Sequence, residues 1–332
     1  MNQFNEMTLT TKFKWIIAAL FCTVLSLNTT AQAQGYPNKP IQLIVGWPPG
    51  GGADIVARIM AEGLSASLNQ TVTVSNRPGA SGNLGAETAA RSAPDGYTIL
   101  LVGGNHATNI HLYQKLGYDP MKDFEPISLL TVAPNLLAVN PSLPVRNVAE
   151  FVALARSKPN QLSYGSAGNG TTGHLAMELL KSTTKIDIVH IPYKGAAPFI
   201  TDLIGGQVML GFDGIGSTGP QIKNGRLRAI ATSDSKRTAL FPDVPTVAES
   251  GYPGFEVLLW QGLLAPAGTP RDIVNRLNAA VQETLNRPAS LKRLNELALE
   301  GTGGSPEQFR AFLTNEISKW GGVIRTIGVK LD

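Results

Sequence analysis

The residues best suited to chemistry in this chain lie in two glycine-rich stretches. The first runs from Trp47 to Asp54 (Trp-Pro-Pro-Gly-Gly-Gly-Ala-Asp) and connects an apolar run to a segment with helical spacing of apolar residues. A helix N-terminus offers free N–H groups and the positive end of the helix dipole, and glycine keeps side chains away from both. No lysine follows in the Gly-Lys-Ser/Thr manner of a P-loop. The stretch therefore predicts a site for a small carboxylate or similar anion rather than for a nucleoside triphosphate.

Asp54 closes this first stretch and falls in the first turn of the predicted helix. Its carboxylate can cap the helix N-terminus, which is a purely structural role. It can equally hold an ordered water molecule that contacts a ligand. The sequence leaves both alternatives open.

The second stretch runs from Ser166 to His174, and Gly168, Gly170 and Gly173 match the pattern G-x-G-x-x-G. This pattern between a predicted strand and helix is typical of a dinucleotide site. However, the acidic residue expected at the end of the next strand is absent, because Asp187 begins that strand. Hydroxyl groups in the stretch suit a smaller anion, so we expect a small-anion site, with a dinucleotide site or a structural turn as alternatives.

Catalytic constellations are missing from the sequence. Neither Ser81 nor Ser166 stands in a G-x-S-x-G nucleophile elbow. His106 and His111 are five residues apart, not the four of a metal-binding helix face, and no cysteine or carboxylate clusters with them. We therefore predict no enzyme activity, no metal and no cofactor.

Three further residue types remain candidates for ligand contact. His174 stands at a predicted helix start, where it can donate to a ligand or be a satisfied polar residue. Asp213 follows a predicted strand and can accept from a donor group on the ligand. Trp47 and Trp260 can wall an apolar pocket, and a core position is an equal alternative for each.

Strands and helices alternate on both sides of the middle of the chain. In the first half, strands are expected at 41–45, 71–75 and 97–102, with helices from 53 and through 90, and a loop at 103–106. In the second half, strands at 136–139, 162–164, 186–191 and 208–212 alternate with helices at 148–156, 174–180 and 198–204. This order predicts parallel sheets with right-handed crossovers, and ligands collect at the carboxyl ends of such strands.

The C-terminal third begins with a strand at 227–232, a turn-rich segment at 242–246 and an apolar run at 257–264. Two amphipathic helices are then expected, one after Thr269-Pro270 and one after the capping-box sequence that starts at Ser305. No flexible linker separates the two halves. The chain is therefore expected to cross more than once between two hinged lobes that hold a ligand in their cleft.

Export is expected from the N-terminus. Lys12 and Lys14 precede an apolar run that is too short to span a bilayer, and Ala31-Gln-Ala33 provides a cleavage site. Removing residues 1–33 takes away Cys22 and changes the formal charge from +4 to +3. The remaining chain is predicted to be exported and soluble, to need no disulfide and, because its positive charge is scattered, to bind no nucleic acid.

Distinct sequence blocks lie in order along the mature chain. They include Pro49-Gly-Gly51 with Asp54-Ile-Val-Ala-Arg58, Asn76-Arg-Pro-Gly-Ala80, Pro94-Asp-Gly-Tyr-Thr98, Tyr164-Gly-Ser-Ala-Gly168, Pro192-Tyr-Lys-Gly195 and Leu264-Ala-Pro-Ala-Gly-Thr-Pro270. These blocks resemble those of Bug-type receptors, the extracytoplasmic substrate-binding proteins of tripartite tricarboxylate transporters. The resemblance implies an α/β, two-lobed Venus-flytrap fold, each lobe a mostly parallel sheet flanked by helices. It also implies that loops of both lobes bind the carboxylate of an organic acid through backbone amides and ordered waters.

We accordingly expect a signal peptide at 1–33, lobe 1 at 34–131, lobe 2 at 132–231, and a return to lobe 1 with C-terminal helices at 232–332. The predicted ligand-binding residues are Trp47, Pro49, Gly50, Gly51, Gly52, Ala53, Asp54, Asn105, Ser166, Ala167, Gly168, Thr171, Thr172, His174 and Asp213. The expected function is that of a monomeric periplasmic receptor that delivers a small carboxylate to a membrane transporter. An exported hydrolase or oxidoreductase, and a ligand sensor for a signalling kinase, are the alternatives. The sequence does not choose among di- and tricarboxylates, aromatic acids, amino acids and amides.

Overall fold

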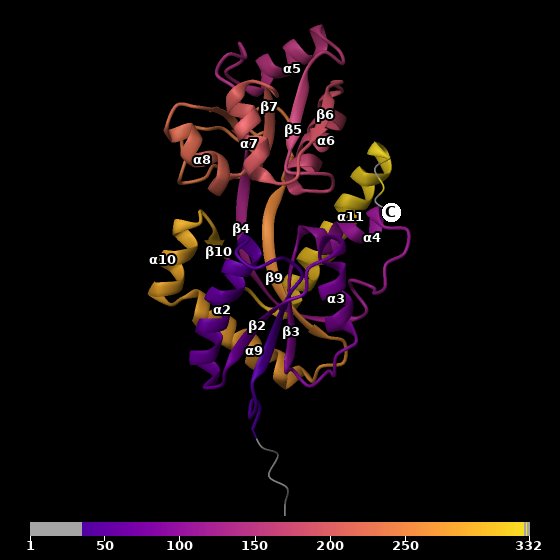
Figure 1. Ribbon diagram of the computed structural model, residues 1–332, viewed down its shortest axis with the longest axis vertical. Coiled ribbons are helices and arrows are strands. Elements are labelled where there is room, and N and C mark those ends of the chain that lie inside the picture. Colours follow the sequence, from indigo (N-terminus) through magenta and orange to yellow (C-terminus); the bar gives the residue numbers. More distant parts are fainter. Residues whose placement is uncertain (1–34, 329, 331–332) are drawn as a thin grey trace, which may run out of the picture. The chain divides into compact units, whose positions relative to one another are not determined.

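Strand β4 (Phe124–Val139) joins two groups of strands in the computed structural model, which describes residues 35–328 and Lys330. Its first part, 124–134, pairs antiparallel with β9 (Leu258–Pro266), and its last part, 135–139, pairs antiparallel with β7 (Leu210–Gly214). In Figure 1, β4 and β9 run side by side between the two groups. The predicted signal peptide, residues 1–33, lies outside the described residues.

The first group of strands contains a parallel core. Strand β1 (Ile41–Val45) pairs in parallel with β2 (Val72–Asn76) and β3 (Thr98–Gly103), and β9 adds antiparallel to β3. The helical elements of this stretch are α2 (Gly52–Leu68), η1 (Ala80–Gly82), α3 (Asn83–Ala90) and α4 (Gly104–Leu112). The first half of the chain therefore follows the predicted alternation, with an antiparallel strand added from the C-terminal third.

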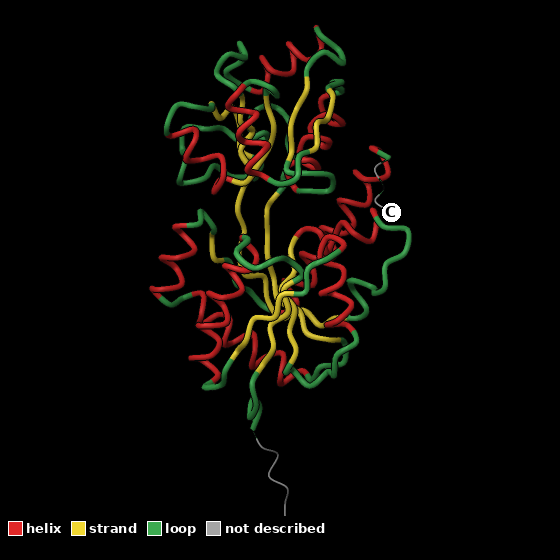
Figure 2. Tube along the Cα trace, viewed as in Figure 1, coloured by secondary structure: helices red, strands yellow, loops and turns green. Residues whose placement is uncertain are grey.

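The second group repeats the parallel core. Strand β5 (Ser163–Ser166) pairs in parallel with β6 (Val189–Pro192) and β7, and β8 (Arg228–Thr232) pairs antiparallel with β4. Its helices are α5 (Val148–Ser157), α6 (Thr172–Thr184), α7 (Ala196–Gly205) and α8 (Ile215–Lys223). Across the described residues the strands follow the order β2-β1-β3-β9-β4-β7-β5-β6. Figure 2 shows the helices arranged around both groups of strands.

The C-terminal third completes the first group with α9 (Arg271–Leu285), α10 (Pro288–Glu296), β10 (Glu300–Gly301) and α11 (Pro306–Ile327). Val274, Leu277 and Val281 of α9 are almost completely buried, as are Phe309 and Trp320 of α11. Both predicted apolar stripes are therefore core positions. Within residues 35–328, no helix combines the length and the apolar character needed to cross a bilayer.

Several local predictions were wrong. The expected loop at 103–106 is the first turn of α4, which begins at Gly104 directly after β3. Thr269 does not cap α9, because its hydroxyl donates to Pro266 O and the N-cap position is Pro270. The strand predicted at 136–139 is only the end of β4, and α8 and α10 were not predicted at all.

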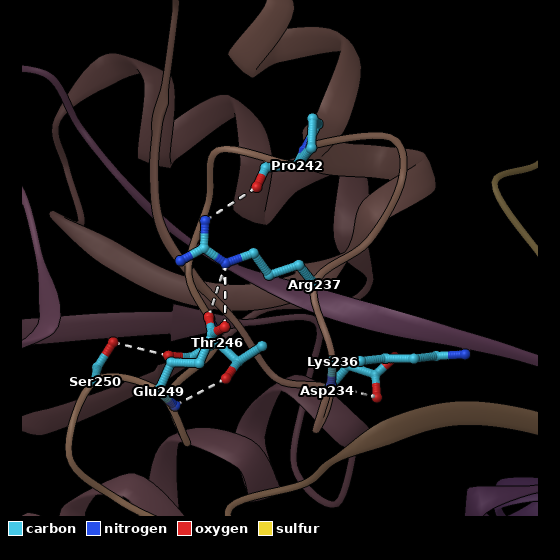
Figure 3. Close-up of polar contacts among 7 residues, drawn as sticks. All are labelled: Asp234, Lys236, Arg237, Pro242, Thr246, Glu249 and Ser250. Carbon is cyan, nitrogen blue, oxygen red and sulfur yellow. Dashed lines mark hydrogen bonds and ion pairs between the residues drawn. The ribbon is translucent and has the colours of Figure 1, made fainter.

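The segment between β8 and β9 is folded by its own polar contacts (Figure 3). Arg237 Nε lies 2.9 and 3.2 Å from the two carboxylate oxygens of Glu249, and Arg237 Nη1 donates to Pro242 O at 3.2 Å. Glu249 Oε2 accepts from Thr246 N, Thr246 Oγ1 accepts from Glu249 N, and Ser250 Oγ donates to Thr246 O. These contacts give the segment predicted to be rich in turns a defined course back to β9.

The predicted capping box of α11 is confirmed and gives a direct stability test. Ser305 Oγ accepts from Gln308 N, and Gln308 Oε1 accepts from Ser305 N at 2.7 Å. Replacing Ser305 with alanine should lower the free energy of unfolding by about 1 kcal/mol, measured by urea denaturation. Thr314→Ala, on an exposed position of the same helix, is the control. An equal loss in both variants would contradict a specific role for the cap.

Candidate functional site

The loop before α2 presents bare backbone to solvent. Pro49, Gly50, Gly51 and Gly52 are exposed, and no side chain caps α2 at its N-cap residue Gly51. A Cβ added at Gly51 would come no closer than 3.7 Å to another atom, and one added at Gly52 would meet nothing within 4 Å. Neither residue has a left-handed φ, whereas Gly50 does at +84°. The fold thus requires glycine at position 50 but not at 51 or 52, where the first N–H groups of α2 lie.

Asp54 ties this loop to the protein. Its carboxylate accepts from Gly50 N at 2.9 Å, from Arg58 at 2.8 and 3.1 Å and from Asn76 Nδ2 at 2.9 Å. The hydrogen bond from Arg58 is the main cause that lowers the pKa of Asp54 to about 2. Because Gly50 precedes the helix, the buried carboxylate holds the loop rather than capping α2. Contact with a ligand through ordered water stays a prediction.

The loop before α6 is also held from within. Ser166 is fully buried, and its Oγ lies 2.7 Å from His190 Nε2 and 3.2 Å from Gly168 N. Thr171 Oγ1 donates to Gly168 O at 2.7 Å and caps α6 by accepting from His174 N. Ala167, Gly168 and Thr172 are half-buried. The predicted residues are therefore together in one loop, with the Ser166 hydroxyl turned to protein partners.

His174 supports the same loop. Its side chain is buried, and Nδ1 accepts from Gly170 N at 3.1 Å. Burial is the main cause that lowers the pKa of His174 to about 4. The neutral ring therefore receives a backbone hydrogen bond, which is the satisfied polar role that the sequence left open.

Close contacts place the two loops near two further helix N-termini. Trp47 and Asn105 line the same small cavity, of about 10 Å³, and Gly104, the first residue of α4, would place a Cβ 3.4 Å from Thr172 Cγ2. Gly173 packs against the backbone of Phe212 and Asp213 at the end of β7, directly before α8. Four helices, α2, α4, α6 and α8, thus begin at this end of the strands. The positive end of each helix dipole lies at its N-terminus, so all four N-termini favour binding of an anion.

Asp213 is half-buried where β7 meets α8. Ser217 Oγ donates to its Oδ2, and burial is the main cause that raises the pKa of the carboxyl. The next residue, Gly214, is the N-cap of α8, has φ −56° and has no neighbour within 4 Å of an added Cβ. An open glycine at a helix N-terminus therefore occurs here as it does at α2.

The structure also places two tryptophans and two histidines that the sequence analysis considered. Trp260 is 2% exposed and donates from Nε1 to Glu316, so the core alternative holds for it, whereas Trp47 is half-buried. His106 is buried against Pro120 O, and His111 contacts Ile317 O. Within the described residues, no three histidine, cysteine or acidic side chains come together as metal ligands would.

Sequence reasoning missed two residues near these loops. Ser81 has a left-handed backbone (φ +54°), and its carbonyl accepts from the amides of Asn105 and Asn109. Strain of this kind in a non-glycine residue persists only where neighbours impose it, and it clusters at functional sites. His190 lies beside Tyr164 in the β5–β6 register, a pairing between adjacent parallel strands that the βαβ order alone could have suggested.

The model of the tripartite tricarboxylate transporter family receptor matches residues 56–329. The chain belongs to this receptor family. The resemblance seen in the sequence is thereby confirmed. The family is one of solute-binding receptors.

Solved structures show the fold of the family. R. palustris Rpa4515 with adipate is 38% identical, with 89% of this chain and 99% of that chain covered and a TM-score of 0.77. MatC (Rpa3494) from Rhodopseudomonas palustris with bound malate is 34% identical, with 87% and 100% covered and a TM-score of 0.74. The periplasmic binding protein BugD is 36% identical, with 89% and 99% covered and a TM-score of 0.74. This receptor therefore has the predicted α/β two-lobed periplasmic-binding-protein fold.

Proposed function

We propose that this receptor captures a small organic carboxylate between its two lobes in the periplasm, as a monomer, and delivers it to a tripartite transporter. Within the described residues, the predicted division gives 35–131 and 232–328 to lobe 1 and 132–231 to lobe 2. The lobes close on the ligand by bending at β4 and β9, because β4 pairs with strands of both groups. Ligand contact with both lobes shifts the open-closed equilibrium toward the closed form.

Open glycines at helix N-termini are the observation that supports this proposal. Gly51, Gly52 and Gly214 stand where α2 and α8 begin, and the fold imposes glycine at none of them. Glycine without a conformational reason leaves the backbone N–H groups accessible to a ligand. Relatives solved with adipate and malate support a carboxylate as that ligand.

The remaining predicted residues take roles consistent with this proposal. Thr172 lies close to Gly104, the first residue of α4, Asn105 follows Gly104 and lines the cavity that Trp47 also lines, and Pro49 belongs to the α2 loop. Asp213 accepts from a hydroxyl or amino group of the ligand. A hydrolase is not favoured, although Ser166 and His190 are hydrogen-bonded, because Ser166 is fully buried. Delivery to a sensor kinase instead of a transporter would leave uptake intact when the gene is deleted.

A thermal-shift screen of the mature protein, residues 34–332, tests the proposal. Adipate and malate are the first probes, with adipamide as the uncharged control and nicotinamide dinucleotides and divalent metals in the same plate. We expect a carboxylate to raise the melting temperature in proportion to the logarithm of its concentration, whereas adipamide has no effect. A shift with dinucleotide or metal alone would overturn the proposal in favour of an enzyme.

A further inference from the structure

We propose that His190, together with His174, is a positioning residue that fixes the β5–α6 loop for ligand binding. The two rings act on different ends of the loop, His190 through Ser166 and His174 through Gly170. This inference rests on the proposed function, since the loop is one side of the proposed anion site. It assigns a role to His190, which lies outside the loop in sequence.

The ring of His190 is fixed by stacking. Its centroid lies 4.7 Å from that of Tyr164 and 4.1 Å from that of His174, with interplanar angles of 17° and 15°. Tyr164 and His190 are register partners on β5 and β6, and His174 comes from the first turn of α6. Stacking on both faces fixes the plane of the ring, and within that plane Nε2 lies 2.7 Å from Ser166 Oγ.

These contacts anchor a loop that has no charged side chain. Ser166 Oγ also contacts Gly168 N at 3.2 Å, and His174 Nδ1 accepts from Gly170 N at 3.1 Å. The N–H groups of Gly168 and Gly170 are therefore used internally. Their anchoring fixes the orientation of the α6 N-terminus. It also fixes the rest of the loop backbone, whose N–H groups are left for a ligand. Such preorganisation lowers the entropy that binding must overcome.

The contact between His174 and Gly170 requires a neutral imidazole. Nδ1 of His174 can accept a hydrogen bond only while it carries no proton. Burial is the main cause that lowers the pKa of His174 to about 4 and of His190 to about 3. Lys181 opposes protonation of both rings, while Glu178 favours protonation of His174.

The charged groups that face the stack are themselves paired. Tyr164 Oη donates to Glu178 Oε1 at 2.5 Å, and Lys181 Nζ lies 2.8 Å from the same oxygen. For both histidines the pKa in the folded state lies below the ordinary 6.5, so the unfolded chain binds more protons between these values. The stabilisation they provide is complete above pH 6.5 and is lost as the pH falls to about 4 for His174 and to about 3 for His190. The loop should loosen over the same interval.

Two variants of His190 separate stacking from hydrogen bonding. His190→Phe keeps an aromatic ring between Tyr164 and His174 but cannot bond Ser166, whereas His190→Gln keeps a polar group near the position of Nε2. We expect His190→Phe to weaken adipate binding at least tenfold in isothermal titration. The adipate affinity of His190→Gln should lie within threefold of that of the wild type. His111→Gln, a histidine on α4, is the control and should bind as the wild type does.

A readout without ligand keeps the inference independent of the proposed function. Amide hydrogen exchange of residues 166–172 in the unliganded protein should be faster in His190→Phe and normal in His190→Gln. Unchanged exchange and unchanged affinity in His190→Phe would overturn the positioning role. If exchange responds as expected but no acid binds the wild type, the proposed function fails and the positioning role stands.

The pH profile gives the matching test for His174. Asparagine at this position keeps a hydrogen-bond acceptor near the place of Nδ1, and this acceptor does not titrate. The increase in loop exchange expected between pH 6 and 4 should therefore flatten in His174→Asn. In the wild type, loop exchange should change between pH 6 and 4 both with and without adipate. A change without adipate cannot come from protonation of adipate itself. An identical change in both proteins would contradict the role of His174.

Discussion

Replacing Gly51 with valine is expected to weaken carboxylate binding at least 100-fold while leaving the fold intact. The branched side chain would stand over the first N–H groups of α2, where an anion has to approach. The backbone of Gly51 is extended, with φ −79° and ψ 168°, which valine adopts readily. Its nearest neighbour, Pro48 O, would lie 3.7 Å from the new Cβ. Binding and stability are therefore separable at this position.

The matched control is Gly205→Val at the C-terminal end of α7. Gly205 is exposed, has no neighbour within 4 Å of an added Cβ and has no left-handed φ, so it matches Gly51 in exposure and free space, although its backbone is helical where that of Gly51 is extended. Isothermal titration with adipate or malate should show wild-type affinity for this control, and circular dichroism should show native spectra for both variants. Wild-type affinity in Gly51→Val would remove the α2 loop from the site.

Local sequence patterns were sufficient for most elements and for the anion-binding loops. The β-branched run 41–45 and the spacing of Val56, Ile59, Met60 and Leu64 depend only on neighbouring residues, and the structure buries both as expected. The capping box at Ser305 is local in the same sense. Because a helix that follows a parallel strand begins at the strand's carboxyl end, the sequence could also place the glycine loops at one end of the sheet.

Long-range pairing limited the rest of the fold prediction. Strand β4 contains Pro126 and Pro134 and has register shifts against β9, so its 16 residues do not read as one strand. Helix α8 was missed because it contains Gly216, Gly219 and Pro220, which oppose helix in a local interpretation. Its formation depends on packing against β4 and β7, which no local pattern reveals.

The direction of individual side chains was the least predictable part of the site. Ser166 was expected to offer its hydroxyl to a ligand, but the strand partner β6 brings His190 to the buried side of that hydroxyl. The left-handed backbone of Ser81 depends on Asn105 and Asn109, more than twenty residues away. Helix N-termini can thus be located from the sequence. The side chains that orient the loops before them can be identified only once the strand register of the folded protein is known.

Replacing Asp54 with asparagine is expected to lower the free energy of unfolding by about 2 kcal/mol at pH 7. The carboxylate holds Gly50 N, Arg58 and Asn76, and asparagine can replace at most part of this set. Since the pKa of Asp54 is about 2 in the folded protein and ordinarily 3.8, its charged form stabilises the fold above pH 3.8. That stabilisation is lost as the pH falls through 2. Adipate affinity should fall about tenfold, because the loop before α2 loses its anchor.

Urea denaturation between pH 7 and 2 tests the origin of this effect. The difference between wild type and Asp54→Asn should be constant above about pH 5 and shrink as the pH falls toward 2, because protonated Asp54 resembles asparagine in charge. Glu62→Gln, which removes an exposed ion-pair partner of Arg293 from the same helix, is the control and should change stability by less than about 0.5 kcal/mol. A difference that persists unchanged at pH 2 would assign the effect of Asp54 to shape rather than charge. The α2 loop would then be held by packing instead of by a buried carboxylate.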